Sequence, residues 1–190
     1  IGIFSNKVTI PFLKEGYRSP LGAYLLVNDR TLNDRLFGGC VFSTWRLFDS
    51  SKAEGKFETD GKKKLNNRET WVVRYRPKSG LRDGSSIKLY FDAENFHHVR
   101  TVMQLSEPDI AFEVNGPNTP ATSANASNGT VLTEDFDDYK ETNGLTLPHK
   151  YNIDLFLNGA TGTVQFKWNF NIVEYRLVND FGKGFFNFTV

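Results

Sequence analysis

The segment that most constrains the fold of this chain is residues 136–150, because it predicts a β-hairpin. Its sequence, FDDYKETNGLTLPHK, places apolar and aromatic residues at intervals among polar ones. Asn143 and Gly144 are the residue types that occupy the two positive-φ positions of a tight type I′ turn. Pro148 cannot donate to a strand ladder, so we expect it near a sheet edge or a strand start. The segment is scaffold, and it indicates an antiparallel β-protein.

The same pattern continues through the chain from Ala53 onward. Seventeen Phe, seven Tyr and three Trp among 190 residues favour strands over a helical bundle. Short strands separated by turn dipeptides such as Asp60-Gly61 and Asn66-Asn67 predict an antiparallel meander. The expected strands are residues 55–59, 69–76, 87–92, 99–105, 110–114, 131–139, 146–157, 164–175 and 185–190.

The N-terminal third carries a different pattern. Residues 1–12 predict a hairpin that ends at Pro11. Ser19-Pro20 is a typical helix start, with a capping hydroxyl and a proline in the first turn. Apolar residues then recur at helical spacing up to Gly38-Gly39, with a break near Asn28. We expect one broken helix, or two short ones, packed on an apolar surface.

Alternation gives each expected strand one apolar face. The pattern fits a mainly β (α+β) fold, with one curved antiparallel sheet whose apolar concave face is covered by short helices. The side chains expected to face inward form a candidate hydrophobic cavity, and they are Trp71, Val73, Tyr75, Ile87, Leu89, Phe91, Val99, Met103, Ile153, Leu155, Phe166 and Trp168. Alternation alone predicts a buried face and does not distinguish an open cavity from a filled core.

Charge is unevenly distributed along the chain. Residues 1–100 hold 18 Lys and Arg against 11 Asp and Glu, whereas residues 101–190 hold 5 against 11. The basic residues alternate with acidic and apolar ones along the expected strands. Two interpretations stay open, a solvated sheet face and a contact with an anionic surface.

The sequence offers little reaction chemistry. Cys40, the only cysteine, is expected to be a small buried hydrophobe. His97 and His98 are adjacent, so on a strand they point to opposite faces, and we expect surface or turn histidines and no metal site. The acidic run 134–138 is expected to be a solvated strand edge. Phosphate-binding loops and nucleophile elbows are missing, which predicts a non-enzyme without cofactor or nucleic-acid partner.

The length of 190 residues predicts a single domain, 1–190. Residues 115–130 contain no large apolar side chain and are expected to be a flexible loop insertion. No run of residues approaches the roughly 20 apolar residues of a transmembrane helix. The chain opens at Ile1 without a signal-like segment, so we expect either a removed signal segment or a fragment.

Three segments give the chain a family resemblance. WVVRYRPKSG (71–80), IKLYFDAENFHHVRT (87–101) and EDFDDYKETNGLTLPHKY (134–151) occur in the order and spacing seen in a branch of periplasmic proteins, common in acidobacteria. That branch is similar to the LolA/LolB lipoprotein carriers. Residues 19–49 resemble the helical segment that precedes those strands. The resemblance begins at about residue 10 and carries no counterpart of the family's N-terminal helix and first strands.

The resemblance implies a half-barrel whose short helices plug an apolar cavity for acyl chains. It implies a periplasmic, non-enzymatic carrier or binding protein for a lipid or a lipoprotein acyl chain. The classical gating arginine lies in the missing N-terminal part, so no residue is assigned to it. The alternative is a structural or assembly module of the cell envelope whose apolar face packs on a partner protein.

Overall fold

The computed structural model describes residues 2–4, 7–9, 20–27, 34–41, 45, 47, 55–78, 81, 84–106, 110–112, 122–124, 129–159 and 162–176. The predicted strand 185–190 lies outside these residues. Most of the predicted loop 115–130 lies outside them as well, and its described part includes a three-residue strand, β8 (Thr122–Ala124), paired with β7 (Ile110–Phe112).

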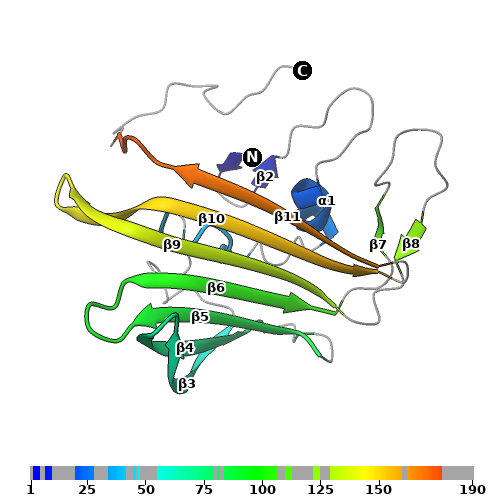
Figure 1. Ribbon diagram of the computed structural model, residues 1–190, viewed down its shortest axis with the longest axis horizontal. Helices are drawn as coiled ribbons and strands as arrows, with labels where there is room; N and C mark the ends of the chain where they lie inside the picture. Colours follow the sequence, from blue (N-terminus) through cyan, green and yellow to red (C-terminus); the bar gives the residue numbers. More distant parts are fainter. Residues whose placement is uncertain are drawn as a thin grey trace.

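A seven-stranded antiparallel sheet dominates the fold, and it confirms the predicted mainly β class (Figure 1). Its strand order is β11-β10-β9-β6-β5-β4-β3, a meander interrupted only by the β7–β8 pair. The strands are β3 (Lys56–Leu65), β4 (Arg68–Arg76), β5 (Ser86–Asp92), β6 (His98–Leu105), β9 (Thr130–Thr142), β10 (Leu145–Gly159) and β11 (Gly162–Asn171). A separate hairpin joins β1 (Gly2–Phe4) to β2 (Lys7–Thr9), as predicted for residues 1–12.

The turn chemistry explains the register of the long hairpins. Asn143 and Gly144 have φ values of 52° and 80°, so the predicted type I′ turn between β9 and β10 is confirmed. Asn66 and Asn67 form a similar turn between β3 and β4, with φ values of 48° and 64°. Pro148 lies in β10 just before its first pair with β11, so it occupies a local edge, as expected.

One predicted turn is wrong. Asp60 and Gly61 lie inside β3, where the register with β4 shifts between Thr59 and Lys62. Gly61 has a φ of 79°, and the one extra residue of β3 forms a bulge. An Asp-Gly pair supplies the positive φ that both a turn and a bulge require, which is why the sequence pattern did not separate them.

Helix is scarce among the described residues. The helix α1 (Pro20–Val27) begins at Pro20, as predicted. The second expected helical part is instead a turn at residues 34–38 followed by the short 3-10 helix η1 (Gly39–Val41). Leu47 is the one further described residue in 3-10 conformation, so the predicted layer of covering helices is not confirmed.

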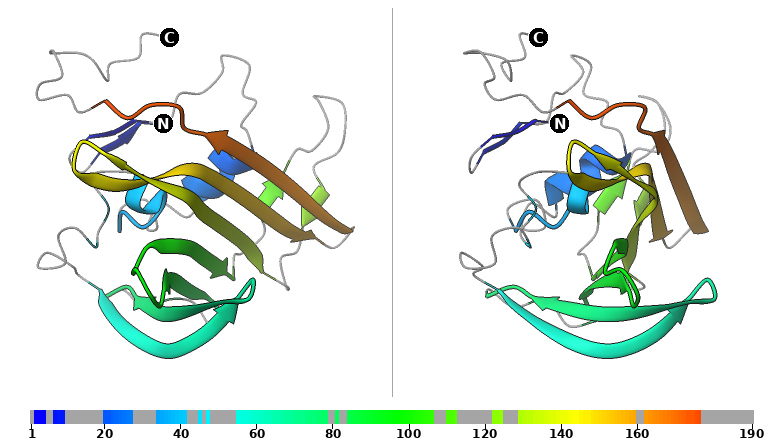
Figure 2. Two further views of the ribbon diagram at one scale, coloured as in Figure 1. Left: turned by 60° about the vertical axis from the view of Figure 1, so that its left-hand side comes forward. Right: turned by 90° about the vertical axis from the view of Figure 1, so that its left-hand side faces the viewer.

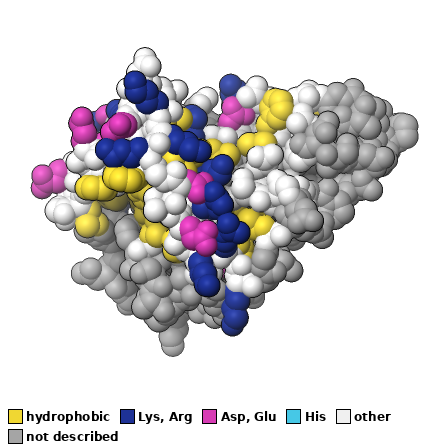
Figure 3. Space-filling view, turned by 90° about the horizontal axis from the view of Figure 1, so that it is seen from below, with side chains coloured by type: hydrophobic (Ala, Val, Ile, Leu, Met, Phe, Trp, Pro, Cys, Tyr) yellow, Lys and Arg dark blue, Asp and Glu magenta, His cyan; other side chains and the backbone are white. Residues whose placement is uncertain are grey.

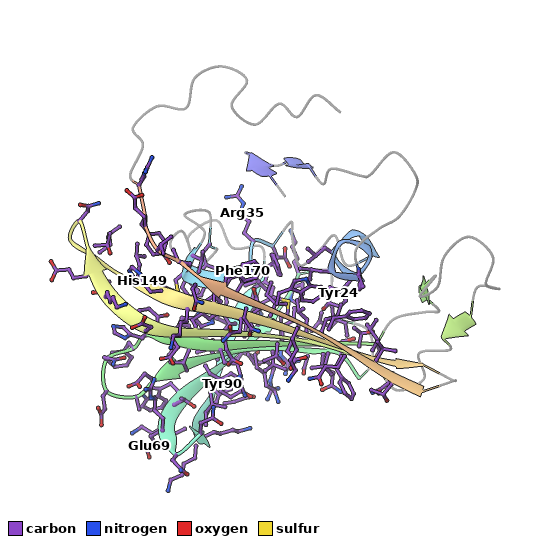
Figure 4. All side chains as sticks on the ribbon, turned by 45° about the horizontal axis from the view of Figure 1, so that its top comes forward. Tyr24, Arg35, Glu69, Tyr90, His149 and Phe170 are labelled. Atoms are coloured by element: carbon purple, nitrogen blue, oxygen red, sulfur yellow. The ribbon has the colours of Figure 1, made fainter. Side chains whose placement is uncertain are left out.

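The sheet curves strongly, and α1 and η1 lie on its concave side (Figure 2). The hydrophobic core forms on that side, where Tyr24 and Leu25 of α1 join Leu36, Phe37 and Trp45 against the sheet. In Figure 4 the side chains crowd between α1 and the sheet, with Tyr24 at the helix and Glu69 at the distant β3–β4 end. The concave face of the sheet is therefore the buried one.

Candidate functional site

The concave face brings together nine of the twelve residues predicted to face inward. Six of them are buried in the core, Tyr75, Ile87, Leu89, Met103, Ile153 and Leu155. Phe91, Phe166 and Trp168 are partly buried and pack against the same core. Cross-strand register explains the grouping, because directly opposed residues share a face. Met103, for example, pairs with Ile87 on one side and with Leu132 on the other.

Three of the twelve residues lie outside this core. Trp71 is half-buried, with the ammonium group of Lys62 5.1 Å from its ring centroid. Val73 is half-buried as well. Val99 is buried but occupies a bulge, since Tyr90 pairs with Arg100 and Phe91 pairs with His98. The bulge shifts the alternation by one residue, so His98 rather than Val99 reaches the core.

A buried carboxylate stands at the centre of the apolar face. Glu134 lies on β9, paired with Thr101 and Ile153, and its side chain is fully buried. Its Oε1 accepts hydrogen bonds from the backbone amide of Gly38 at 2.7 Å and from the Tyr151 hydroxyl at 2.5 Å. Its Oε2 has no hydrogen-bond partner within the described residues. The expectation of a solvated acidic edge is wrong, because β9 is an interior strand between β6 and β10.

Burial changes the acidity of this carboxylate. Removal from water disfavours the charged form and raises the pKa of Glu134 to about 7. The hydrogen bonds from Tyr151 and Gly38 lower the pKa in part, and the neighbouring charge of Asp135 raises it. Burial also raises the pKa of the Tyr151 hydroxyl, and the charge of Glu134 and its hydrogen bond raise it further. Glu134 is therefore a group that gains or loses a proton near neutral pH.

His98 is the second buried titratable group on this face, and its expected surface position is wrong. Its ring stacks on Trp45 at 4.7 Å between centroids and packs on Phe136. Its Nε2 lies 2.9 Å from Thr101 Oγ1 and 3.1 Å from the carbonyl oxygen of Arg100. Burial lowers the pKa of His98 to about 3, so the imidazole is neutral at neutral pH.

The segment 34–41 fits against these polar groups. Gly39 has a φ of 48°, and a Cβ on it would lie 2.7 Å from the His98 ring and from Phe136. Cys40 Sγ lies 3.3 Å from the Tyr139 hydroxyl, which donates to the backbone oxygen of His98 at 2.5 Å. Burial raises the pKa of Cys40 to about 11, so its thiol stays protonated and is a poor nucleophile. These contacts attach segment 34–41 to the sheet.

The described residues offer neither a metal site nor a membrane-spanning helix. They contain no group of three or more His, Cys, Asp or Glu side chains placed to hold a metal ion. None of their helices has the length and apolar character needed to span a membrane.

The signal for Glu134 was present in the sequence. Residues 130, 132, 134 and 136 share one face of a strand, and Leu132 and Phe136 mark that face as the apolar one.

No protein-family profile, curated protein or solved structure matches the chain.

Proposed function

We propose that this chain is a non-enzymatic periplasmic carrier or binding protein for a lipid or a lipoprotein acyl chain. The observation that carries the proposal is the concave face of the seven-stranded sheet, which is apolar from β4 to β11. The three-segment resemblance to the LolA/LolB-like carriers supports the same reading. In this proposal the fold is a half-barrel, and short helical segments cover its concave side.

The acyl chain would replace the side chains that now cover the sheet. Tyr24, Leu25, Leu36, Phe37 and Trp45 fill the concave side in this structure. Segment 34–41 contacts the sheet through the hydrogen bond from Gly38 to Glu134 and through Cys40 beside the Tyr139 hydroxyl. Displacement of this segment would expose an apolar surface that a hydrocarbon chain covers equally well.

The hydrophobic effect sets the size of the expected affinity. Each methylene group that leaves water contributes about 0.8 kcal/mol, which is about fourfold in the dissociation constant. Part of the gain is lost in displacing the covering side chains. We therefore expect affinity to rise with chain length, by a factor smaller than fourfold for each methylene.

A calorimetric titration with saturated fatty acids from octanoate to hexadecanoate tests the proposal. A regular rise in affinity with chain length supports it. Equal or undetectable binding across the series would contradict it, and would leave the concave side as a filled core. The alternative is then a protein partner in the cell envelope. Its expected contact surface is the pair of exposed apolar side chains on β11, Val164 and Phe170.

A further inference from the structure

A pocket of about 520 Å³ lies where β4 ends and β5 begins. Four basic side chains line it, Arg74 and Arg76 from β4, Lys78 from the residues that follow, and Lys88 from β5. Figure 3 views the molecule from the side on which β3 and β4 lie, and basic side chains form a band there with acidic ones among them. The volume is within the range of pockets that hold small ligands.

The basic charge of the pocket is only partly balanced. Arg74 forms a two-point ion pair with Asp60, and Arg76 pairs with Glu58 at 2.8 Å. Lys78 and Lys88 form no ion pair with a carboxylate among the residues that the structure describes, although Lys88 lies close enough to Asp60 to help lower the pKa of that carboxyl. Lys88 is also the direct cross-strand partner of Arg74, so two like charges face each other. Asp60 already offsets part of that repulsion, and a bound anion would offset more of it.

The pocket also contains neutral donors suited to an oxyanion. Ser85 Oγ accepts a hydrogen bond from the Ser106 amide at 2.8 Å, which leaves its hydroxyl proton available to donate. Ser86 lines the pocket as well, on the first position of β5. Arg and Lys together with hydroxyl donors are the groups that bind phosphate oxygens in proteins.

The floor of the pocket is apolar and continuous with the hydrophobic core. Tyr75 lines the pocket and is fully buried in the core beside Ile87. Leu81 lines the pocket and packs against the same core. Arg74 and Lys88 alternate with Tyr75 and Ile87, so they lie on the opposite face of the sheet from the core. An amphiphile bound here would place its anionic head on the basic groups and its chains past Tyr75 and Leu81 toward the concave face.

We propose that this pocket binds a phosphate group, and that the phosphate is the headgroup of an anionic lipid whose chains lie on the concave face. The second half of this statement rests on the proposed function.

A second pocket, of about 330 Å³ and lined by Arg68, Arg100, Asp135 and Asp137, lacks the charge excess, because Arg100 pairs with Asp135 at 2.6 Å and Arg68 with Asp92 at 3.2 Å.

The test is calorimetric titration of the full chain with three probes. These are inorganic phosphate, dihexanoyl phosphatidic acid and zwitterionic dihexanoyl phosphatidylcholine, the lipids kept below their micelle concentrations. We expect phosphatidic acid to bind about tenfold or more tightly than phosphatidylcholine, and to weaken as salt rises. The double variant Lys78→Gln/Lys88→Gln should remove that preference. The charge-matched control Lys64→Gln/Lys150→Gln alters two exposed lysines outside the pocket and should change the affinity less than about twofold.

The outcomes separate the two proposals. Phosphate binding that depends on Lys78 and Lys88, without any effect of acyl chains, supports the phosphate site with free phosphate as its ligand and overturns the lipid assignment. Fatty-acid binding that rises with chain length, without preference for phosphatidic acid, overturns the phosphate site and leaves the proposed function standing. Unchanged phosphatidic acid binding in Lys78→Gln/Lys88→Gln also overturns the site.

Discussion

The backbone amide of Gly38 donates a hydrogen bond to Oε1 of Glu134, across 2.7 Å and 96 positions of sequence. This contact joins segment 34–41 to the middle of an interior strand. The acceptor is a fully buried carboxylate whose pKa is raised to about 7 by its burial. The attachment of the covering segment and the protonation of Glu134 are therefore linked.

Stability should depend on pH through Glu134. The pKa of Glu134 is about 7 in the folded state, above the usual 4.5 of an exposed glutamate, so the folded state holds the proton more tightly. The stabilisation is fully present below pH 4.5 and is lost as pH rises to 7, by about 3 kcal/mol as an order of magnitude. Urea unfolding of the wild type and Glu134→Gln should show a difference in free energy that changes across this window. A constant difference would contradict the assignment.

His98 should act in the opposite direction, over a pH window that overlaps that of Glu134 and extends to lower pH. The pKa of His98 in the folded state is about 3, below the usual 6.5. Its contribution to the free energy of unfolding is therefore present above pH 6.5 and is lost as pH falls toward 3. The variant His98→Phe keeps an aromatic ring against Trp45 and removes the titration. Its stability should fall less than that of the wild type between these pH values, and an equal fall would refute the account.

The hydrogen bond from the Tyr151 hydroxyl should lower the pKa of Glu134. This hydrogen bond favours the charged carboxylate, so Tyr151→Phe should raise the pKa of Glu134 further. Carbon-13 NMR of the glutamate carboxyl groups measures this pKa directly. Tyr90→Phe, on the opposite face of the sheet, serves as the control and should leave the titration of Glu134 unchanged. A Glu134 pKa that stays constant or falls in Tyr151→Phe would show that the hydrogen bond is absent.

Gly39 should be intolerant of any side chain. An alanine Cβ there would lie 2.7 Å from the His98 ring, in addition to the strain of a positive φ, so Gly39→Ala should cost about 1–3 kcal/mol beyond the strain alone. Gly144→Ala gives the strain alone, because that residue has a φ of 80° and open space around it. Chemical unfolding of both variants provides the comparison. Equal losses would mean that segment 34–41 does not pack on His98 as described.

Much of the sheet was predictable because short-range rules determine it. Alternation fixed which face of β5 and β10 is buried, and Asn143-Gly144 fixed the β9–β10 register. The same rules failed where a β-bulge adds a single residue to one strand of a pair. The bulge at Val99 moved His98 into the core, and the bulge at Asp60-Gly61 extended β3 through an apparent turn.

The polar part of the site depended on contacts that no local pattern contains. Glu134 was predicted to be solvated because acidic residues surround it in sequence, yet Asp135 points to the other face and pairs with Arg100. The raised pKa of Glu134 arises from burial under core residues that are distant in the chain, and the hydrogen bonds from Gly38 and Tyr151, which partly offset that rise, are equally distant. The basic pocket likewise combines β4, β5 and the connection between them.

The most direct test of the central claim, an acyl chain on the concave face, is the fluorescence of Trp45. This residue stacks on His98 within the core, whereas Trp71 lies outside it. In the variant Trp71→Phe/Trp168→Phe, hexadecanoate should shift the Trp45 emission at lower concentration than dodecanoate does. The matched variant Trp45→Phe/Trp168→Phe, which reports Trp71 alone, should not respond. An unchanged Trp45 emission with bound hexadecanoate would contradict the account, because the chain would then occupy another surface.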